Sequence, residues 1–239
     1  PLDEYKNMRK SGLIAITLRD DDELIEAKTA YAEDNIIFVT KHGQCIKFAV
    51  EDVRETGRSS IGVRGINLTA HDEVVGMQLE KQGDSLLIVS EKGMGKRTAI
   101  EEFTIQRRGG KGVTGTKMQS DDFVERMLYT SSHDNILFFT NLGKVFTLKA
   151  YQIPSASRIS KGLPLVNLLS FEENEKLAAV VNCSSIDQGG YLIFATKTGT
   201  IKKTELLQYK NIRSTGIRAI TLNEGDELME VSLTDGTKE

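Results

Sequence analysis

Apolar residues are concentrated in four short runs, each followed by a glycine-bearing turn and a more polar segment. The runs are rich in β-branched and aromatic residues, which is typical of strands that are buried on both faces. The glycine at the third position of each turn can adopt a positive φ and so permits a tight reversal. The pattern therefore predicts four β-hairpins, over residues 35–48, 85–98, 135–148 and 191–204.

A second segment also recurs, and it opens with a glycine followed by mostly apolar positions. Its copies are residues 12–18, 62–68, 112–118, 162–168 and 216–222. The first four begin fifty residues apart and the last begins fifty-four residues further on. After each copy come a polar or acidic turn and one more predicted strand, over residues 23–30, 73–79, 123–130, 176–182 and 227–233. We therefore expect four strands in each repeat.

Four strands in about fifty residues are typical of a propeller blade. A solenoid would use shorter coils, and a sandwich would not repeat so regularly. The chain contains no tryptophan, which excludes a standard WD40 array. Helical periodicity is confined to short stretches at residues 101–103 and 204–209. We predict one all-β domain over residues 1–239, with a partial blade at 1–33 and blades at about 34–83, 84–133, 134–189 and 190–239.

Composition adds limits on where the protein works. No run of about eighteen apolar residues is present, so no membrane-spanning helix is expected. No signal-peptide pattern occurs at the start, and Pro1 lies inside a repeat, as expected for part of a longer chain. Cys45 and Cys183 each lie in or beside an apolar run. We expect both to be buried free thiols in a reducing cytoplasm.

Basic residues recur in register with the repeat, although the formal net charge is −3. Local potential matters more for phosphate binding than the total charge. An arginine stands shortly before each glycine-led segment: Arg9, Arg58, Arg108, Arg158 and Arg213. Further candidate cations are Lys47, Arg97 and Lys203, which follow the hairpin glycines, and Lys144 and Lys161, which lie in an acid-free stretch. These residues either bind a polyanion or anchor neighbouring blades and decorate exposed strands.

One copy of the basic loop is richer than the others. It reads Gln106-Arg107-Arg108-Gly109-Gly110-Lys111-Gly112, with three cations and three glycines in seven residues. Glycines allow backbone N–H groups to approach an anion, and arginine forks match phosphate oxygens. The composition suits a polyanion backbone and has no evident means of reading bases.

This heptapeptide resembles the gyrase A box of the DNA gyrase A C-terminal domain. Flanking residues 11–24, 112–117 and 120–146 are also similar to that family, and the resemblance covers essentially the whole chain. It implies a β-pinwheel, a propeller-like disc whose blades exchange strands. The order of the repeats differs from the family pattern, in which the box usually lies in the first blade. Here one and a half repeats precede it.

The resemblance further implies that a basic rim bends and wraps duplex DNA without base specificity, which lets DNA gyrase introduce negative supercoils. Double-stranded DNA, the rest of the gyrase A protein and the gyrase B protein are the implied partners, in the bacterial cytoplasm at the nucleoid. The isolated domain is expected to be monomeric and to bind no cofactor, since ATP and Mg²⁺ act elsewhere in the holoenzyme. The alternatives are the corresponding C-terminal domain of topoisomerase IV and a protein-interaction propeller with basic loops.

No catalytic or metal site is predicted. His42, His71 and His133 are scattered and share no metal-ligand spacing with the cysteines. The acidic groups at 20–22 and 121–122 match ordinary polar turns of the other repeats. No nucleophile elbow, phosphate-binding Walker loop or Ser/His/Asp arrangement is present. The domain is therefore expected to be a non-catalytic part of an ATP-dependent type II topoisomerase.

Overall fold

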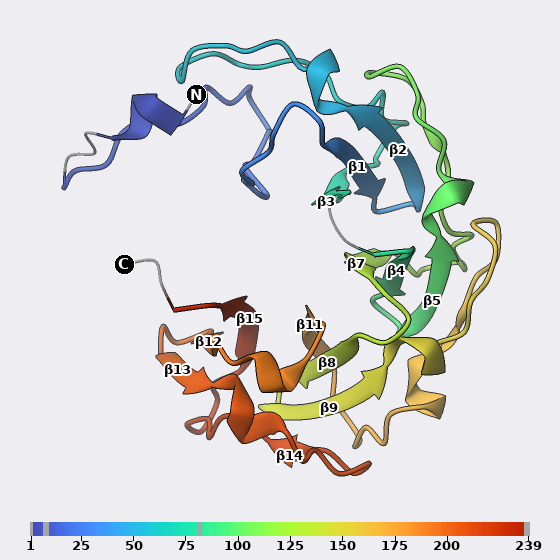
Figure 1. The fold of residues 1–239 in the computed structure, drawn as a ribbon, viewed down its shortest axis with the longest axis vertical. Coiled ribbons are helices and arrows are strands. Elements are labelled where there is room, and N and C mark those ends of the chain that lie inside the picture. The colour runs from blue at the N-terminus through green and yellow to red at the C-terminus, as the bar shows by residue number, and fades with distance from the viewer. Residues whose placement is uncertain (1, 7–9, 81–82, 237–239) are drawn as a thin grey trace. The chain divides into compact units, whose positions relative to one another are not determined.

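The computed structural model describes residues 2–6, 10–80 and 83–236. This part of the chain contains β-strands, short 3-10 helices and loops but no α-helix, which confirms the all-β prediction (Figure 1). None of the described helices is long and apolar enough to span a membrane. All four predicted hairpins are present and antiparallel. They are β1 (Asn35–Thr40) with β2 (Gln44–Ala49), β4 (Ser85–Ser90) with β5 (Met94–Ala99), β8 (Asn135–Thr140) with β9 (Lys144–Lys149), and β12 (Tyr191–Thr196) with β13 (Ile201–Glu205).

A third strand, which follows later in the chain, pairs with the first strand of each hairpin. These strands are β3 (Val74–Leu79), β7 (Val124–Thr130), β11 (Leu177–Cys183) and β15 (Leu228–Thr234). Each pairing has a register shift near its end, as between Val39 and Thr40 or between Val89 and Ser90. The shift recurs in all four sheets, so the sheets repeat in detail as well as in strand order.

The fourth strand of a sheet comes from the following repeat. Strand β6 (Val113–Thr114) pairs with β2, β10 (Leu163–Pro164) with β5, and β14 (Ile217–Arg218) with β9. The resulting sheet orders are β3-β1-β2-β6, β10-β5-β4-β7 and β11-β8-β9-β14, and a three-stranded sheet has the order β13-β12-β15. This exchange of strands between consecutive repeats confirms the expected β-pinwheel.

Short 3-10 helices follow the second strand of each hairpin. They are η2 (Val50–Asp52), η3 (Ile100–Glu102), η4 (Ala150–Gln152) and η7 (Leu206–Tyr209); the others are η1 (Leu2–Tyr5), η5 (Leu165–Asn167) and η6 (Ile186–Gln188). The helical turns expected near residues 101–103 and 204–209 correspond to η3 and η7. Each of the four helices begins the loop that leads to the next glycine-led segment.

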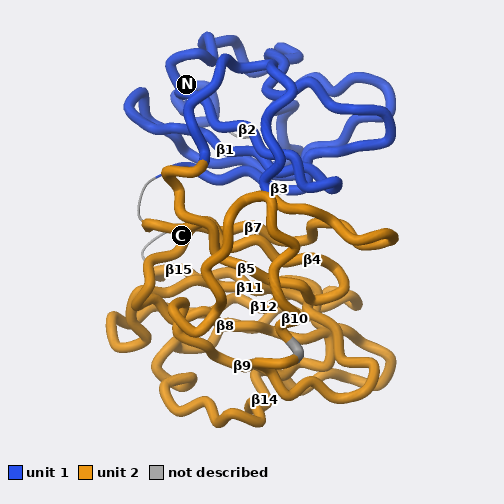
Figure 2. The backbone as a smooth tube through the Cα atoms, turned by 90° about the vertical axis from the view of Figure 1, so that its right-hand side faces the viewer, with its two compact units in different colours: residues 1–81, 103–115 blue, residues 82–102, 116–239 orange. Residues whose placement is uncertain are grey.

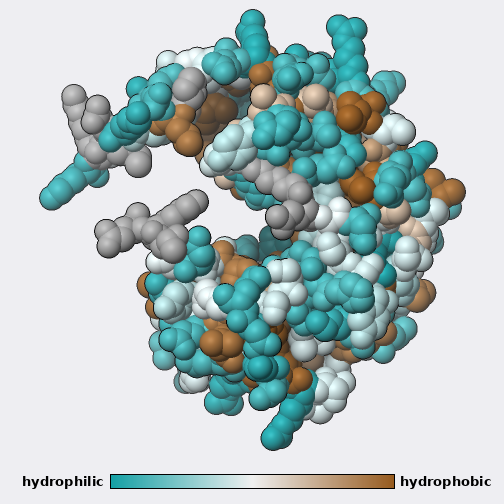
Figure 3. All heavy atoms as spheres, viewed as in Figure 1, coloured by the Kyte–Doolittle hydropathy of each residue, from teal (hydrophilic) through white to brown (hydrophobic). Residues whose placement is uncertain are grey.

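The prediction of strands over residues 12–18, 23–30 and 62–68 is wrong, because these segments belong to no sheet. A strand requires a ladder partner, and no described strand forms a ladder with these segments. Their contacts are instead isolated bonds, such as the Thr17 N–H to the Ser60 carbonyl at 3.3 Å. Several apolar side chains in and beside these segments are exposed, including Ile14 at 67% and Ile61 at 52%, although Ile66 is buried. Figure 3 shows that hydrophobic residues are scattered among hydrophilic ones on the face in view.

The chain forms two compact units, coloured separately in Figure 2. Unit 1 comprises residues 1–81 and 103–115, and unit 2 comprises residues 82–102 and 116–239. The core of unit 1 contains Ile46, Phe48 and Ile66, with Phe38 packed edge-on against Phe48 at a centroid distance of 5.5 Å. In unit 2, buried side chains fill the space between successive sheets, as where Phe139 packs against Phe194.

Both cysteines lie in these interiors. Cys45 is fully buried on β2 and Cys183 is 2% exposed at the end of β11, and both are free thiols, as the sequence predicted. Burial, with a smaller contribution from the Asp134 carboxylate, raises the pKa of Cys183 to about 11. This thiol is therefore protonated at neutral pH and unreactive as a nucleophile.

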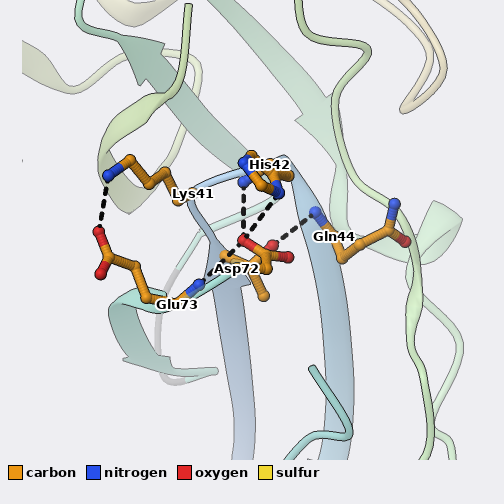
Figure 4. Close-up of polar contacts among 6 residues, drawn as sticks. Lys41, His42, Gln44, Asp72 and Glu73 are labelled. Carbon is orange, nitrogen blue, oxygen red and sulfur yellow. Dashed lines mark hydrogen bonds and ion pairs between the residues drawn. The ribbon is translucent and has the colours of Figure 1, made fainter. Parts of the chain in front are cut away.

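A carboxylate from the polar turn caps the hairpin turn of each sheet. In Figure 4 the Asp72 carboxylate accepts hydrogen bonds from the backbone N–H groups of His42 and Glu73, both at 3.0 Å. Lys41 forms an ion pair with Glu73 at 2.9 Å beside it. The equivalent carboxylates are Asp122, Glu175 and Asp226, which accept from the hydroxyls of Ser90, Thr140 and Thr198 respectively, each at 2.7 Å. The acidic turns therefore stabilise the hairpins.

Hydrogen bonding has a marked effect on the last of these carboxylates. Burial acts to raise the pKa of Asp226, but hydrogen bonds from the hydroxyls of Thr196 and Thr198 and from the backbone N–H groups of Thr198 and Glu227 lower it to about 2. The charged form is thus the one that the turn holds. Among the described residues, no group of three or more His, Cys, Asp or Glu side chains is arranged to hold a metal ion.

Candidate nucleic-acid interface

The heptapeptide Gln106–Gly112, hereafter the box loop, lies in unit 1 and leads into β6. Its backbone is bonded on both sides. The Gln106 N–H donates to the Lys47 carbonyl of β2 at 2.7 Å, and the Gly109 N–H donates to the Gly65 carbonyl at 2.8 Å. The Gly110 carbonyl accepts from the Asn67 N–H, also at 2.8 Å. The loop is therefore fixed between β2 and the segment at residues 65–67.

Two of the glycines are required by the geometry of the loop. Gly109 and Gly112 have φ values of +79° and +73°, in the left-handed region that L-residues with side chains disfavour. A Cβ on Gly112 would also lie 2.4 Å from the Cys45 carbonyl oxygen, much closer than contact distance. Gly112 thus lets the chain pass directly over β2 and enter β6.

The Arg108 side chain binds backbone carbonyls of the protein. Its Nε donates to the Asp52 carbonyl at 2.9 Å, and its Nη1 donates to the Arg64 carbonyl. In the preceding repeat, Arg58 Nη1 donates in the same way to the Ile14 carbonyl. For these two arginines the anchoring interpretation therefore describes the observed contacts, and the guanidinium groups join one loop to the segment before it.

Arg107 and Lys111 differ from Arg108 because both are exposed. Neither side chain has a hydrogen-bond or ion-pair partner among the residues that the structure describes. Their donors are free to meet an anion, and the fixed backbone beneath them reduces the ordering cost of doing so. The Gln106 side chain is different again, because its Nε2 is buried and has no acceptor in the described part of the chain.

A second basic loop, residues 157–162, aligns with residues 107–112 of the box loop. Arg158 and Lys161 match Arg108 and Lys111. Lys161 is exposed, whereas Arg158 is half-buried and its N–H donates to the Glu102 carboxylate at 3.0 Å. The loop packs on residues 116–117, where the Lys117 N–H donates to the Ser160 carbonyl at 3.2 Å.

Lys117 and Lys161 line the same small hollow of unit 2, and both side chains are exposed. Lys117 was not predicted from the sequence as a candidate cation. The signal was present, because Lys117 occupies the position of Thr17 and Asn67 in the aligned copies, next to the basic loop of the following repeat. Arg64 is also exposed and was not predicted as a candidate cation. Its backbone carbonyl accepts a hydrogen bond from Arg108.

Two candidate cations prove to be buried and bonded, so we remove them from the proposed contact surface. Lys47 is 7% exposed and its Nζ forms an ion pair with Glu80 at 2.8 Å. Arg97 is 8% exposed and its Nε donates to the Ile153 carbonyl at 3.0 Å. Both lie on the second strand of a hairpin, where the loop of the next repeat covers them. A ligand cannot reach them without displacing that loop.

The remaining candidates have varied surroundings. Lys144 is half-buried and paired with Glu172. Lys203 is exposed, with its Nζ 4.2 Å from the centroid of the Tyr191 ring in a cation–π arrangement. Arg213 is exposed and its side chain has no partner in the described part of the chain. Arg9 lies outside the described residues.

Repeats of about fifty residues form the sheets, and three of the four described sheets take a strand from the following repeat, next to a basic loop. This arrangement defines a strand-exchanging β-propeller. The chain belongs to the DNA gyrase C-terminal domain, beta-propeller family, whose model matches residues 1–30, 34–79, 84–131, 134–184 and 190–235.

The chain is similar to part of the DNA gyrase A protein from several bacteria. It is 51% identical over 100 residues to the protein of Clostridium acetobutylicum, a match that covers 42% of this chain and 12% of that protein. The Streptococcus pyogenes serotype M3 protein is 48% identical over 101 residues, with the same coverage. The matched region thus spans about one eighth of the length of these relatives.

Solved structures share the fold. The C-terminal domain of DNA topoisomerase IV superposes with a TM-score of 0.71 at 21% identity, covering 92% of this chain and 69% of that one. The DNA gyrase A C-terminal domain also gives 0.71, at 18% identity, covering 97% and 74%. At these identities the likeness extends to the fold alone.

Proposed function

We propose that this domain binds duplex DNA without base specificity and bends it, as the DNA-wrapping part of a bacterial gyrase A protein. One observation carries the proposal: Arg107 and Lys111 are exposed and have no partner among the described residues, on a loop whose backbone is bonded on both sides. A cation held in place by a rigid support binds phosphate with little loss of conformational entropy.

The net charge of −3 does not oppose this proposal. Several carboxylates are engaged in capping hairpin turns, as with Asp122, Glu175 and Asp226, which are each at most 9% exposed. The exposed cations Lys117 and Lys161, by contrast, line the same small hollow, and Lys161 belongs to the second basic loop. Phosphates respond to this local potential, because more distant charges are screened over about 8–10 Å at physiological salt.

The box loop has the composition for backbone contacts and not for base reading. Its cations can meet phosphate oxygens in any sequence, and among the described residues no α-helix is available to enter the major groove. Bending is the expected consequence when basic loops recur along one chain, because each successive contact draws more of the duplex onto the protein.

Gyrase is favoured over topoisomerase IV as the parent enzyme by the intact heptapeptide and by gyrase A relatives at about half identity. The remainder of the gyrase A protein and the gyrase B protein are then the protein partners in the bacterial cytoplasm. ATP and Mg²⁺ would act on those other parts, and the domain itself would supply DNA geometry and not chemistry.

Binding to a labelled duplex of random sequence, measured from low to moderate salt, tests the proposal. Contacts to about five to eight phosphates predict a log–log salt slope of roughly −4 to −7. Alanine at Arg107, Arg108 and Lys111 together should reduce bending more than affinity, because the other loops still supply charge. Lys41→Ala, which removes a cation paired with Glu73, is the matched control. Affinity that is nearly independent of salt would contradict the proposal.

A further inference from the structure

Lys96 is the most deeply buried cation in the described part of the chain. It lies on β5 with 1% of its surface exposed. Its ammonium donates to three backbone carbonyls of the second basic loop: Ser157 at 2.8 Å, Arg158 at 2.9 Å and Ser160 at 2.9 Å. All three ammonium protons are thus directed at one loop of the following repeat, and DNA cannot reach this group.

These bonds determine which groups of the loop face outward. With three carbonyls turned toward Lys96, the side chains of Ser157, Ile159 and Lys161 are exposed. The Thr98 hydroxyl, also on β5, donates to the Ala156 carbonyl at 3.0 Å and extends the attachment. Strand β5 therefore holds the loop from below, and Lys161 stands at its outer side.

The box loop is fixed by other means at the same place. The residue fifty positions before Lys96 is Ile46, whose side chain lies close beneath Gly110 and Gly112. Gly109 can take φ of +79°, a conformation that Ile159, at the matching position of the second loop, does not adopt. The second loop has Ile159 and Ser160 at the positions of Gly109 and Gly110. Its carbonyls are bonded by the Lys96 ammonium, which takes the place of packing that depends on these two glycines.

We propose that Lys96 is a positioning residue for DNA binding: it shapes the loop Ser157–Gly162 so that Lys161 reaches the DNA backbone, without touching DNA itself. The proposal rests on the proposed function and assigns the second loop a contact role alongside the box loop. Removing the ammonium takes a donor from each of three carbonyls, although Ser157 and Ser160 keep backbone donors in the Ser160 and Lys117 N–H groups, and this loss disfavours the loop conformation. Lys161 would then lose its fixed support.

The test is a double-mutant cycle on DNA affinity. Lys161→Ala should weaken binding about three- to tenfold and reduce the steepness of the salt slope by about one. Lys96→Met keeps most of the side-chain volume and should weaken binding to a similar extent. In the double variant the two effects should overlap, because Lys161 on a released loop has little left to lose. Lys111→Ala, on the box loop of unit 1, is the matched control and should add to Lys96→Met without overlap.

Each outcome separates the two claims. Additive effects of Lys96→Met and Lys161→Ala, with both variants folded, would overturn the positioning role. A Lys161→Ala variant that binds like the parent chain, while Arg107→Ala binds weakly, would overturn the contact role of this loop and leave the proposed function standing. A parent chain that binds no duplex would overturn the proposed function itself. If Lys96→Met does not fold, Lys96→Gln retains two donors for the same carbonyls and serves in the same cycle.

Discussion

The guanidinium of Arg108 donates to the backbone carbonyl of Arg64, 44 residues earlier in the chain. The bond from Arg58 to Ile14 spans the same 44 residues one repeat before. These arginines link each basic loop to the preceding glycine-led segment. In the box loop, Arg108 therefore stabilises the loop conformation, whereas the side chains of Arg107 and Lys111 face solvent.

These different roles predict that alanine substitution of two adjacent arginines will change the free energy of unfolding by different amounts. Arg108→Ala should lower the free energy of unfolding of the protein by about 1 kcal/mol, because two backbone carbonyls lose their donor. Arg107→Ala should change that free energy by less than about 0.5 kcal/mol, as for an exposed side chain without partners. Denaturant unfolding of both variants measures this. The assignment fails if Arg107→Ala is the more destabilising change.

DNA binding should rank the same two variants differently. Arg107→Ala should weaken affinity about three- to tenfold by removing a phosphate contact. Arg108→Lys keeps the charge but loses the planar fork that serves two carbonyls, so it should reduce bending of a labelled duplex more than it reduces affinity. If bending and affinity fall by the same factor in each of the two variants, both arginines act only as surface charge.

Gly112 should be far less tolerant of alanine than Gly62, although both have positive φ. Gly62→Ala should cost about 1 kcal/mol of unfolding free energy from backbone strain, because nothing lies within 4 Å of the new Cβ. Gly112→Ala should cost about 3 kcal/mol, since its Cβ would also meet the Cys45 carbonyl oxygen at 2.4 Å. Thermal or denaturant unfolding measures the loss of unfolding free energy in both variants. The difference between Gly112→Ala and Gly62→Ala gives the contribution of the steric clash. Equal costs would mean that Gly112 does not approach the Cys45 carbonyl of β2 as closely as described.

The hairpin-capping carboxylate Asp226 should make stability depend on acid pH. Its pKa is about 2 in the folded protein against an ordinary value of 3.8, so the folded state favours the charged form. The stabilisation is present in full above about pH 4 and is lost as the pH falls through about 2. Asp226→Asn should therefore lower the melting temperature at pH 6, and its difference from the parent chain should vanish near pH 2. Glu224→Gln, at an exposed position in the same turn, should show no such difference at either pH.

The hairpins and the repeat were predictable because their signals are local. Apolar runs such as Asn35–Thr40 and a glycine three residues later specify strand and turn within a dozen positions. The exchanged strands were harder to delimit, because β6 has only Val113 and Thr114 in its ladder, while the apolar pattern extends to residue 118. Segments with the same pattern at residues 12–18 and 62–68 form no strand, since a partner strand and not the pattern decides pairing.

The site was less predictable because burial of a cation depends on residues distant in sequence. Lys47 resembles a solvent-facing lysine in its own hairpin, but Glu80 pairs with it from 33 residues away. Lys96 is followed by Arg97 in a polar strand, and nothing local reveals that a loop more than sixty residues later places three carbonyls on its ammonium. The repeat located the basic loops correctly, whereas only the fold separates cations that support a loop from cations that face solvent.

Wrapping of duplex DNA by this domain would change the topology of a circular DNA. The most direct measurement closes a nicked circular DNA with ligase in the presence of the protein and then determines the linking number after the protein is removed. Wrapping predicts a shift of one consistent sign that grows with protein concentration and shrinks in the Arg107, Arg108 and Lys111 triple alanine variant. An unchanged linking number at concentrations that saturate binding would contradict wrapping by this domain.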